Sequence, residues 1–315
     1  MSSPTTLATA SSIFLGVILA STSNAETITV CLDGSCDFTD PAAAVQAAAD
    51  GDVIEIAAGT YLLDETISLY GPSVDILGAV DGKGRPATIL DGQGTRQVLS
   101  MLLLPGSTPR VENVVITNGF AEYGGGMFLR GGAPVFENCV ISGNHADIQG
   151  GAMFLNGGAS TTFIGCDISE NTAAHPRFSS SGQGGAAWIS EGVVTLVDSE
   201  VSGNSAQSAG GGFGLSSSGE VVLNNSRICG NIAPGGPDSS QIYGSGTLTV
   251  VSGCVDESCD CVLNDPADLN GDNAVNGADL GLLLANWGQP GIGDLNGDDI
   301  VGGADLGLML AAWSK

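Results

Sequence analysis

Short runs of alternating apolar and polar residues, bounded by Gly and Asn, repeat along residues 110–250. The repeat is close to 26 residues long and is stretched once to about 34. A glycine-rich signature recurs at residues 124–129, 150–155, 184–189 and 210–215, and a second signature that ends in Asn recurs at residues 139–144, 166–171, 199–204 and 226–231. Because this fixed period contains no helical pattern, it predicts a solenoid in which each period is one coil of a parallel β-helix.

Alignment of the coils places equivalent side chains in vertical columns. Two columns are apolar throughout and are predicted to face the interior: Phe136, Phe163, Leu196 and Leu223 in one, and Ile141, Ile168, Val201 and Ile228 in the other. A third column contains Asn118, Asn144, Asn171, Asn204 and Asn231. At the roughly 4.8 Å spacing of neighbouring strands, these amides are expected to hydrogen-bond from coil to coil as a structural ladder.

An aromatic column alternates with apolar positions of the same strands. Phe128, Phe154 and Trp188 each stand between two apolar residues, so one set faces the core and the other faces outward. Gly214 breaks the aromatic set, whereas the flanking Leu and Ile set is unbroken. The pattern favours core positions for the rings, and it leaves open an outward platform for sugar rings.

The segments before the repeats suggest a family resemblance. Residues 41–51 read as a short Ala-rich helix that is expected to cap the open end of the solenoid, and residues 53–56, 59–61 and 88–92 read as strands. The order of these segments resembles the pectin-lyase-like right-handed β-helix superfamily. The Gly-Gly-Ala and Asn-bearing coils resemble its polymorphic outer-membrane-protein branch. The resemblance covers residues 27 to about 255 and implies a mostly β, right-handed parallel β-helix.

The C-terminal segment contains a duplicated loop with calcium-binding chemistry. Residues 268–288 recur as residues 294–314, with 15 of 21 positions identical. Positions 1, 3, 5, 7, 9 and 12 of such a loop supply oxygen ligands to Ca²⁺. These are Asp268, Asn270, Asp272, the Ala274 carbonyl, Asn276 and Asp279 in the first loop, and Asp294, Asn296, Asp298, the Ile300 carbonyl and Asp305 in the second, where Gly302 leaves position 9 to water. At position 6, Asn273 and Asp299 are expected to tolerate the positive φ of the turn.

An apolar helix is predicted after each loop, at residues 280–287 and 306–313. Helices of this length are not stable alone, so the two are expected to pack on each other once calcium organises the loops. The duplicated loop and helix resemble the type I dockerin family, over residues 268–315. The resemblance implies two bound Ca²⁺ ions and a cohesin partner. The alternative is a calcium-stapled cap that has no partner.

Length, charge and cysteine content limit the possible functions. The net charge of −26 argues against nucleic acid as a ligand, and against an anionic polysaccharide unless calcium bridges the protein and the polymer.

Residues 13–25 read as the apolar and cleavage regions of a secretory signal peptide, and no apolar run is long enough to span a membrane. Eight cysteines in an exported chain suggest disulfides. Cys31–Cys36 is the expected pair, and Cys254, Cys259 and Cys261 are expected to contain a further bridge. We expect a signal peptide (1–25), a β-helix (26–262), a linker (263–267) and a dockerin (268–315), in a secreted or cell-surface protein.

Candidate catalytic residues are few. Asp167 and Glu200 share an outward position on neighbouring coils, roughly 5 Å apart, and Arg227 follows on the next coil. This is near the carboxylate separation of retaining glycosidases, but a solvated ladder relieved by Arg227 is the simpler interpretation. The two histidines, His145 and His175, are interpreted as loop residues. None of the Asn-Thr-Asp, Asp-Asp and Gly-His-Gly motifs of the pectin-hydrolysing branch is present.

The sequence therefore favours an exported, non-catalytic interaction module that binds carbohydrate and is tethered by its dockerin to a cohesin-bearing partner. Two alternatives remain. One is a glycoside hydrolase or polysaccharide lyase delivered by its dockerin. The other is a structural, adhesin-like surface protein.

Overall fold

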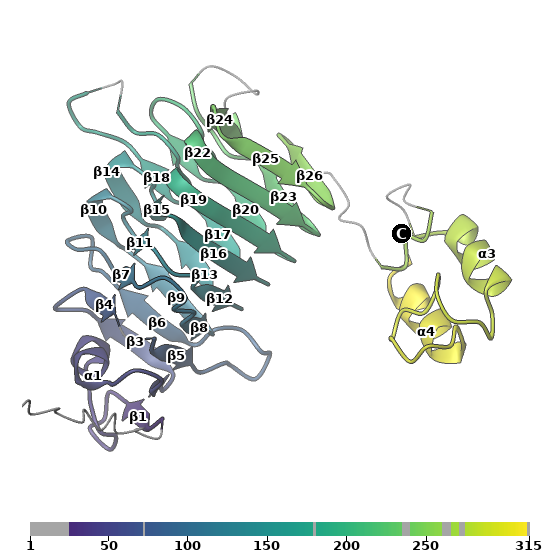
Figure 1. Cartoon of the computed structure of the whole chain (residues 1–315), viewed down its shortest axis with the longest axis horizontal. Helices are drawn as coiled ribbons and strands as arrows, with labels where there is room; N and C mark the ends of the chain where they lie inside the picture. The colour runs from purple at the N-terminus through teal and green to yellow at the C-terminus, as the bar shows by residue number, and fades with distance from the viewer. Residues whose placement is uncertain are drawn as a thin grey trace, which may run out of the picture.

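The computed structural model describes residues 25–71, 73–178, 181–234, 240–259, 266–270 and 275–313. Residues 1–24 of the predicted signal peptide lie outside the described residues, as do the predicted linker residues 263–265, Cys261, Asp272, Asn273 and Ala274. The described residues form a stack of parallel coils followed by a small helical unit (Figure 1). Within them, no helix has the length and apolar character needed to cross a membrane.

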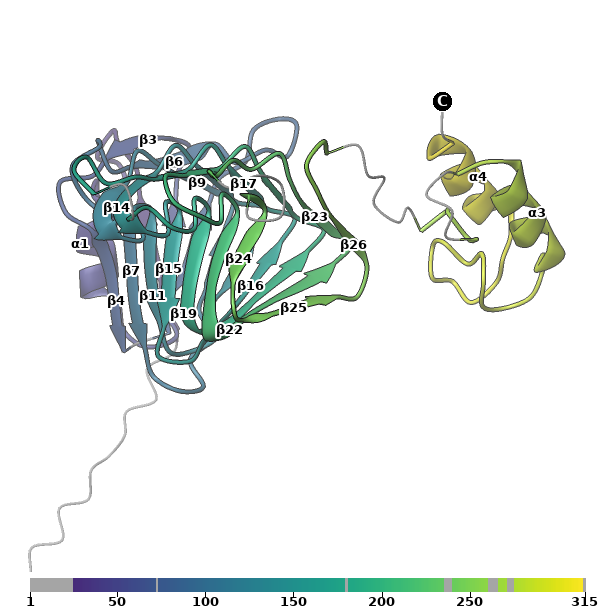
Figure 2. The same ribbon diagram turned by 90° about the horizontal axis from the view of Figure 1, so that it is seen from above.

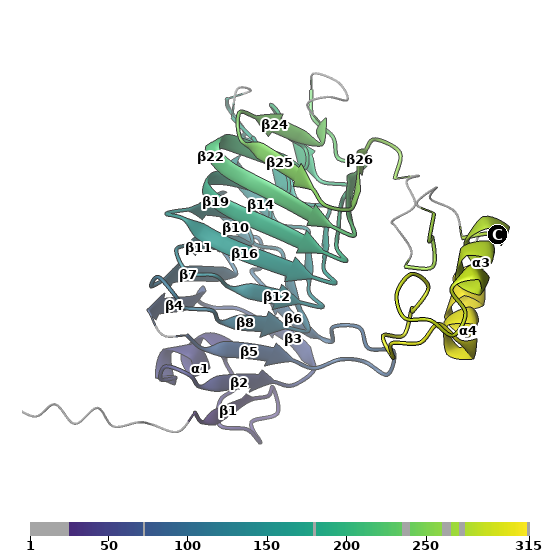
Figure 3. The same ribbon diagram turned by 45° about the vertical axis from the view of Figure 1, so that its right-hand side comes forward.

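The coils build three parallel sheets, and every pairing between named strands is parallel. The largest sheet has 14 strands: β1 (Thr27–Val30), β2 (Val53–Ile56), β4 (Ile67–Gly71), β5 (Asp75–Gly78), β7 (Leu99–Leu103), β8 (Arg110–Glu112), β11 (Met127–Arg130), β12 (Val135–Glu137), β15 (Met153–Asn156), β16 (Ala159–Ile164), β19 (Ala187–Val197), β22 (Phe213–Asn224), β24 (Ile242–Gly244) and β25 (Thr247–Val250). Figure 2 shows β7, β11, β15, β19 and β22 side by side, and Figure 3 shows β2, β5, β8 and β12.

The second sheet has eight strands: β3 (Gly59–Leu62), β6 (Thr88–Asp91), β9 (Val114–Thr117), β13 (Val140–Ser142), β17 (Asp167–Ser169), β20 (Glu200–Ser202), β23 (Ser226–Cys229) and β26 (Gly253–Asp256). The third has four: β10 (Phe120–Tyr123), β14 (His145–Gln149), β18 (Thr172–Ala173) and β21 (Ser205–Ala206). Each repeat therefore contributes a strand to more than one face, as a β-helix coil does.

The two predicted core columns are confirmed. Phe136, Phe163, Leu196 and Leu223 stand in register on β12, β16, β19 and β22 and are fully buried. The second column, from Ile141 to Ile228, is in register and equally buried. The Phe136 and Phe163 rings stack with centroids 5.0 Å apart. Because parallel coils repeat the same inward position, one apolar residue type per position fills the interior from end to end.

The asparagine ladder is confirmed for four of its five predicted members. The side-chain nitrogen of Asn144 donates to the amide oxygen of Asn171 at 2.9 Å, and the same contact at 2.9 Å joins Asn171 to Asn204 and Asn204 to Asn231. Gln241 ends the ladder by accepting from Asn231 at 2.7 Å. All four asparagines are buried.

Asn118 was wrongly placed in this ladder. The coil there reads Asn118-Gly119 where the next reads Gly143-Asn144, so Gly119 occupies the ladder register and its N–H donates to Asn144 at 2.8 Å. Asn118 lies at the exposed turn with φ +51° and donates to Asp91 instead.

A second ladder, which was not predicted, runs along the opposite ends of the same strands, since Cys139 precedes β13 and Asn144 follows it. The backbone N–H of Cys139 donates to the sulfur of Cys166, that of Cys166 to the Ser199 hydroxyl, and that of Ser199 to the Ser226 hydroxyl, at 3.4, 3.0 and 3.0 Å. Cys139 and Cys166 are buried free thiols. Burial raises the pKa of Cys139, whereas the hydrogen bond from Cys139 lowers that of Cys166.

Helix α1 (Pro41–Ala47) lies at the N-terminal end of the stack, close to β1 (Figure 1). The Asp40 carboxylate caps it by accepting from the N–H of Ala42, and Ala42, Ala44 and Val45 enter the core of the β-helix. The helix ends at Ala47, before the predicted Gly51, since the backbone of Ala48 is extended and the N–H of Ala49 donates to the Asp52 carboxylate.

Two disulfides join described cysteines. The predicted Cys31–Cys36 bridge is confirmed. Cys229 bonds Cys259 across the last coil, and Cys254 is also disulfide-bonded.

The C-terminal unit contains helices α3 (Gly277–Ala285) and α4 (Gly303–Ala311). Both begin three residues before the predicted apolar runs, inside the last positions of the duplicated loops. They share a small core that includes Val275, Leu283, Val301 and Met309.

Candidate functional site

The aromatic column faces outward, so the core positions that its pattern favoured are wrong. Phe128, Phe154 and Trp188 stand in register on β11, β15 and β19. The residues on either side of them point inward and are fully buried: Met127, Leu129, Met153, Leu155, Ala187 and Ile189. Since side chains alternate along a strand, the rings occupy the outer surface of the 14-stranded sheet.

Two rings of this aromatic column stack on each other. The Phe128 and Phe154 rings stack with centroids 5.7 Å apart and an interplanar angle of 10°. Tyr123 of β10 packs its edge on Phe154 at 5.2 Å, so only 8% of Phe154 is exposed. Phe128 and Trp188 are half-buried and keep accessible ring surface.

Gly214 follows Trp188 in register on β22. A Cβ at this position would lie 2.3 Å from Cε3 of the Trp188 ring. The absence of a side chain therefore gives the indole room to lie over the next coil. The residue that interrupts the aromatic pattern thus defines the position of its largest ring.

A second outward column runs beside the aromatic one. Tyr70, Leu102, Arg130 and Asn156 stand in register on β4, β7, β11 and β15. Tyr70 is 63% exposed and Leu102 is 37% exposed. The outer face of these strands therefore combines aromatic and apolar surface with a few polar groups. We call this surface, made of the two columns, the aromatic face.

The predicted carboxylate column is real but internally paired. Asp167, Glu200 and Arg227 stand in register on β17, β20 and β23. Arg227 Nε lies 2.8 Å from the Glu200 carboxylate. Glu200 also lies close to Cys229 and Cys259, whose sulfurs are joined in a disulfide and cannot serve as metal ligands. This arrangement favours a solvated charge ladder over an acid and nucleophile pair.

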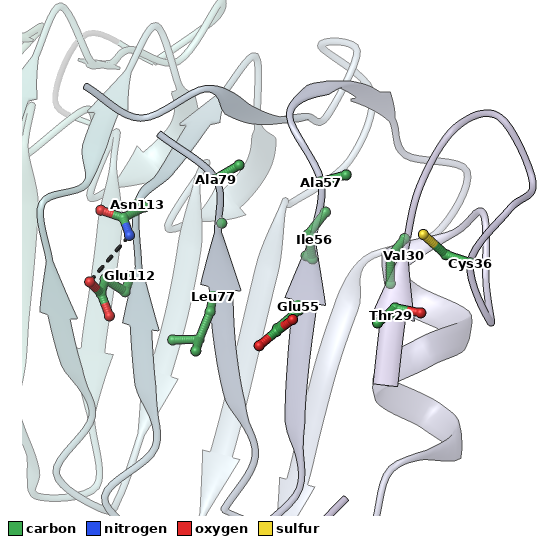
Figure 4. A pocket seen from close by; sticks show the side chains of 11 residues that line it. Thr29, Val30, Cys36, Glu55, Ile56, Ala57, Leu77, Ala79, Glu112 and Asn113 are labelled. Atoms are coloured by element: carbon green, nitrogen blue, oxygen red, sulfur yellow. Dashed lines mark hydrogen bonds between the residues drawn. The ribbon is translucent and has the colours of Figure 1, made fainter. Parts of the chain in front are cut away.

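A hollow of about 490 Å³ opens near the N-terminal end of the large sheet (Figure 4). Glu55, Leu77 and Glu112 stand there in register on β2, β5 and β8. Glu112 contacts Arg110 at 3.1 Å and accepts a hydrogen bond from Asn113 at 3.2 Å. Two coils separate Glu55 from Glu112, about 10 Å along the axis. The sequence did not reveal the Glu55 and Glu112 pair, because the coils that link Glu55, Leu77 and Glu112 have 22 and 35 residues. These unequal lengths hide the repeat period that aligns the later coils.

The second duplicated loop lies wholly within the described residues. Asp294 accepts the backbone N–H groups of Gly297, Asp298 and Asp299, and the side chains of Asn296 and Asp298 each accept one further along the loop. Asp299 has φ +68°, as predicted for position 6. Asp294, Asn296, Asp298 and Asp305 each keep at least one oxygen lone pair beyond these bonds, and hard cations prefer such oxygens.

The two loops end in equivalent buried carboxylates. Asp305 accepts from the N–H groups of Leu295, Asn296 and Gly302, and Asp279 accepts from those of Asn270 and Asn276. Burial by itself would raise the pKa of each carboxyl, but the backbone donors together outweigh it and lower both pKa values below the ordinary range. Each carboxylate thereby ties the start of its helix to the start of its loop.

The helices present apolar side chains to solvent. Leu282 and Leu284 of α3 are exposed, as are Trp287 just after it and Leu308 and Leu310 of α4. The buried core of this unit contains only five residues, so the exposed apolar side chains are as numerous as the buried ones. Such exposed apolar surface is typical of a partner-binding site.

The two histidines were interpreted as loop residues, which is wrong for His145. It begins strand β14, whereas His175 lies in the loop after β18. Both line the same hollow, with Phe120 and Asp147. The separation of 30 residues in the sequence gave no sign that they meet.

Residues 99–255 match the family model described as "Right handed beta helix region", and the β-helix of this chain is therefore right-handed. No curated protein matches the chain. Similar solved structures include pectate lyase Pel9A, at 19% identity and a TM-score of 0.46, over 66% of this chain and 54% of that one. Pectin methylesterases from carrot and Aspergillus niger have 15% identity and TM-scores of 0.36 and 0.40, over 71% and 74% of this chain and 82% and 86% of theirs. The chain spans about half the length of the pectate lyase. Likenesses this low concern the fold alone.

Proposed function

We propose that this chain is an exported, non-catalytic β-helix that binds carbohydrate through its aromatic face and is tethered by a calcium-dependent, dockerin-type unit to a cohesin-bearing partner. The outward aromatic column, in which Phe128 and Trp188 keep accessible ring surface on either side of the covered Phe154, is the observation that carries the proposal. Aromatic rings stack on the apolar face of sugar rings. Phe128 and Trp188 lie two coils apart, about 10 Å along a rigid parallel sheet, which suits an extended ligand that contacts both rings.

The charge of the chain selects among polysaccharides. With a net charge of −26, the surface repels an anionic polymer. Arg130 is a lone cation on the aromatic face, whereas the rings and the Asn156 amide are uncharged. A neutral polysaccharide is therefore the expected ligand.

The tether would hold one Ca²⁺ ion in each loop. The expected ligands are Asp268, Asn270, Asp272, Ala274, Asn276 and Asp279 in the first loop, and Asp294, Asn296, Asp298, Ile300 and Asp305 in the second. The ion would neutralise the carboxylates that crowd each loop. The oxygen-rich donor set of the second loop supports this assignment, and the exposed leucines of α3 and α4 support a protein partner. The disulfides support export.

A second candidate function is hydrolysis of the same polysaccharide. The Glu55 and Glu112 pair favours it, because inverting glycosidases hold their two carboxyl groups roughly 6.5–9.5 Å apart. The spacing of two coils lies close to that range. Leu77 separates the two carboxylates at the surface of the hollow.

A binding assay tests the proposal directly. Residues 26–315, with calcium, are incubated with insoluble neutral and acidic polysaccharides, and both retention and new reducing ends are measured. We expect retention on a neutral polymer, and a loss of about tenfold or more in affinity for Trp188→Ala. Leu62→Ala removes an exposed apolar group from β3, which belongs to a different sheet, and is the control.

The outcomes separate the candidates. Retention that is unchanged by Trp188→Ala contradicts the aromatic-face proposal. New reducing ends that disappear in Glu55→Gln favour the hydrolase, and retention without cleavage argues against it.

A further inference from the structure

A hollow of about 550 Å³ lies over the third, four-stranded sheet, on a different face from the one that carries the aromatic column. Phe120 of β10 and His145 of β14 form its floor, with parallel rings whose centroids are 5.7 Å apart. Asp147, His175 and Gln207 contribute polar groups around it. Pockets of this size, with an apolar wall and a few converging polar groups, are typical of small-ligand sites.

The wall of this hollow comes from the one stretched coil between residues 110 and 250. Asn171 and Gly184 are 13 residues apart, whereas the corresponding Asn and Gly of the neighbouring coils, such as Asn144 and Gly150, are six apart. The extra residues contain His175 and Pro176, which line the hollow. An insertion in a single coil, placed beside a pocket, is the usual way in which a repeat protein builds a local site.

Hydrogen bonds define which polar atoms of the insertion remain available. His175 Nδ1 accepts the backbone N–H groups of Arg177 and Phe178, at 3.0 and 3.1 Å. The neutral ring therefore carries its proton on Nε2, which is a donor. Gln207 Oε1 accepts the backbone N–H of His175 at 2.8 Å, so its side-chain NH₂ is a second donor.

Strand β14 supplies an acceptor to the hollow through Asp147. One Asp147 oxygen lies 3.4 Å from His145 Nε2, and the carboxylate keeps further lone pairs. The hollow thus combines two fixed donors, one carboxylate acceptor and the rings of Phe120 and His145. Only a ligand that both donates and accepts, and that also has an apolar surface, satisfies all of these groups together.

We infer that this hollow is a binding site for a single neutral sugar unit, a specificity site that rests on the proposed carbohydrate-binding function. Sugar hydroxyls accept from His175 and Gln207 and donate to Asp147, while the C–H face of the ring packs on the aromatic floor. Asp147 and the net charge disfavour an anion, and the two donors disfavour a cation. A metal site is not indicated here either, since His145, Asp147 and His175 do not form one of the clusters of close ligand atoms found among the described residues.

Two substitutions invert the hydrogen-bonding groups without changing shape. Gln207→Glu keeps the oxygen that accepts from His175 and replaces the donor by an acceptor. Asp147→Asn replaces the acceptor by a donor. Asp167→Asn makes the same change at an exposed position of β17 and is the control. Circular dichroism and the thermal midpoint verify that each variant is folded.

Calorimetric titration uses neutral hexasaccharides of glucose, xylose and mannose, and a galacturonate hexasaccharide. We expect one neutral series to bind, with both pocket variants weakened about tenfold or more and the control unchanged. Affinity that is equal in the wild type and both pocket variants overturns the inference, as does preferred binding of galacturonate.

The failure of this inference is distinguishable from the failure of the proposed function. If the neutral polymer is retained, and its retention depends on Trp188 but not on Asp147 or Gln207, only the sugar pocket is refuted. If no saccharide binds in either assay, both are refuted.

Discussion

Each asparagine of the ladder satisfies backbone groups that no strand partner can reach. Asn171 accepts from both the backbone and the side-chain nitrogen of Asn144, and its own side chain donates to the carbonyl of Ile141 at 2.8 Å. All of these atoms lie at a buried corner between two sheets. An unpaired buried amide costs about 1–3 kcal/mol, so the ladder stabilises the turn of every coil that it crosses.

We expect Asn171→Ala to lower the free energy of unfolding by about 2–4 kcal/mol, because it removes the acceptor of the buried Asn144 backbone N–H and the amide that donates to the Ile141 carbonyl. Chemical denaturation measures the change. Asn118→Ala is the matched control, since Asn118 is exposed and outside the ladder, and should cost under about 1 kcal/mol. Equal losses in the two variants would show that the ladder adds no stability.

The position of Trp188 depends on one missing Cβ. Gly214→Ala would bring that atom to 2.3 Å from the indole, so the ring must move off the next coil. We expect a loss of several-fold or more in retention on the neutral polymer, with a stability cost of about 1–3 kcal/mol. Gly281→Ala on α3, where an added Cβ meets nothing within 4 Å, should leave retention unchanged.

At the scale of elements, Asp52 joins the first pieces of the solenoid. Its two oxygens accept the N–H of Glu26, just before β1, and that of Ala49, just after α1, at 2.9 and 2.7 Å. The residue itself precedes β2. One carboxylate therefore positions the first strand, the helix and the second strand relative to one another.

These bonds make the stability of the N-terminal end depend on pH. The donors of Glu26 and Ala49 lower the pKa of Asp52 below its ordinary value. The ionised Asp52 therefore stabilises the folded state at pH values above its pKa in the unfolded chain, about 3.9. This stabilisation is lost as the pH falls through the lower pKa that Asp52 has in the folded state. We expect Asp52→Asn to lower the thermal midpoint at pH 7, and the gap from the wild type to shrink below about pH 4. Asp64→Asn changes an exposed carboxylate and should leave the thermal midpoint equal to that of the wild type at both pH values. If the difference in thermal midpoint between Asp52→Asn and the wild type stays constant with pH, the role given to Asp52 is contradicted.

The predictability of each element from sequence depended on how regular its coil was. Between residues 110 and 250, the period fixes the register, so the Phe136 and Ile141 columns were placed correctly. Upstream, the unequal coils around Leu77 hide the register, and the Glu55 and Glu112 pair was missed. Alternation alone could not decide between Phe128 and Met127 for the interior, because both are apolar. The reversed Asn118-Gly119 order shifted one prediction by a single residue.

At the scale of the whole molecule, ion pairs with carboxylates leave few free positive charges on the surface. Arg85, Arg110 and Arg227 each contact at least one carboxylate, at 2.6, 2.6 and 2.8 Å, and so are partly neutralised. Acidic residues outnumber Lys and Arg by 34 to 8. The surface therefore carries a broad negative field, which favours solubility and disfavours anionic polymers.

The C-terminal unit is expected to fold separately from the β-helix, since each has its own core. Helices α3 and α4 have nine residues each, too short to be stable without tertiary support. In the second loop, Asp294 holds three backbone N–H groups, and like-charged carboxylates crowd around it. Removal of Asp268 and Asp294 together takes away the first ligand of both proposed calcium sites.

We therefore expect Asp268→Ala with Asp294→Ala, or addition of a chelator to the wild type, to abolish most of the helical circular dichroism at 222 nm while the β-helix keeps its thermal midpoint. The reason is that the proposed ion supplies the free energy that holds two short helices together. Asp299→Asn removes a charge from the same loop without removing a proposed ligand, and should keep its helicity in calcium. Helicity that survives both the double substitution and the chelator would contradict the calcium assignment, and with it the dockerin-type tether, while leaving the aromatic face untouched.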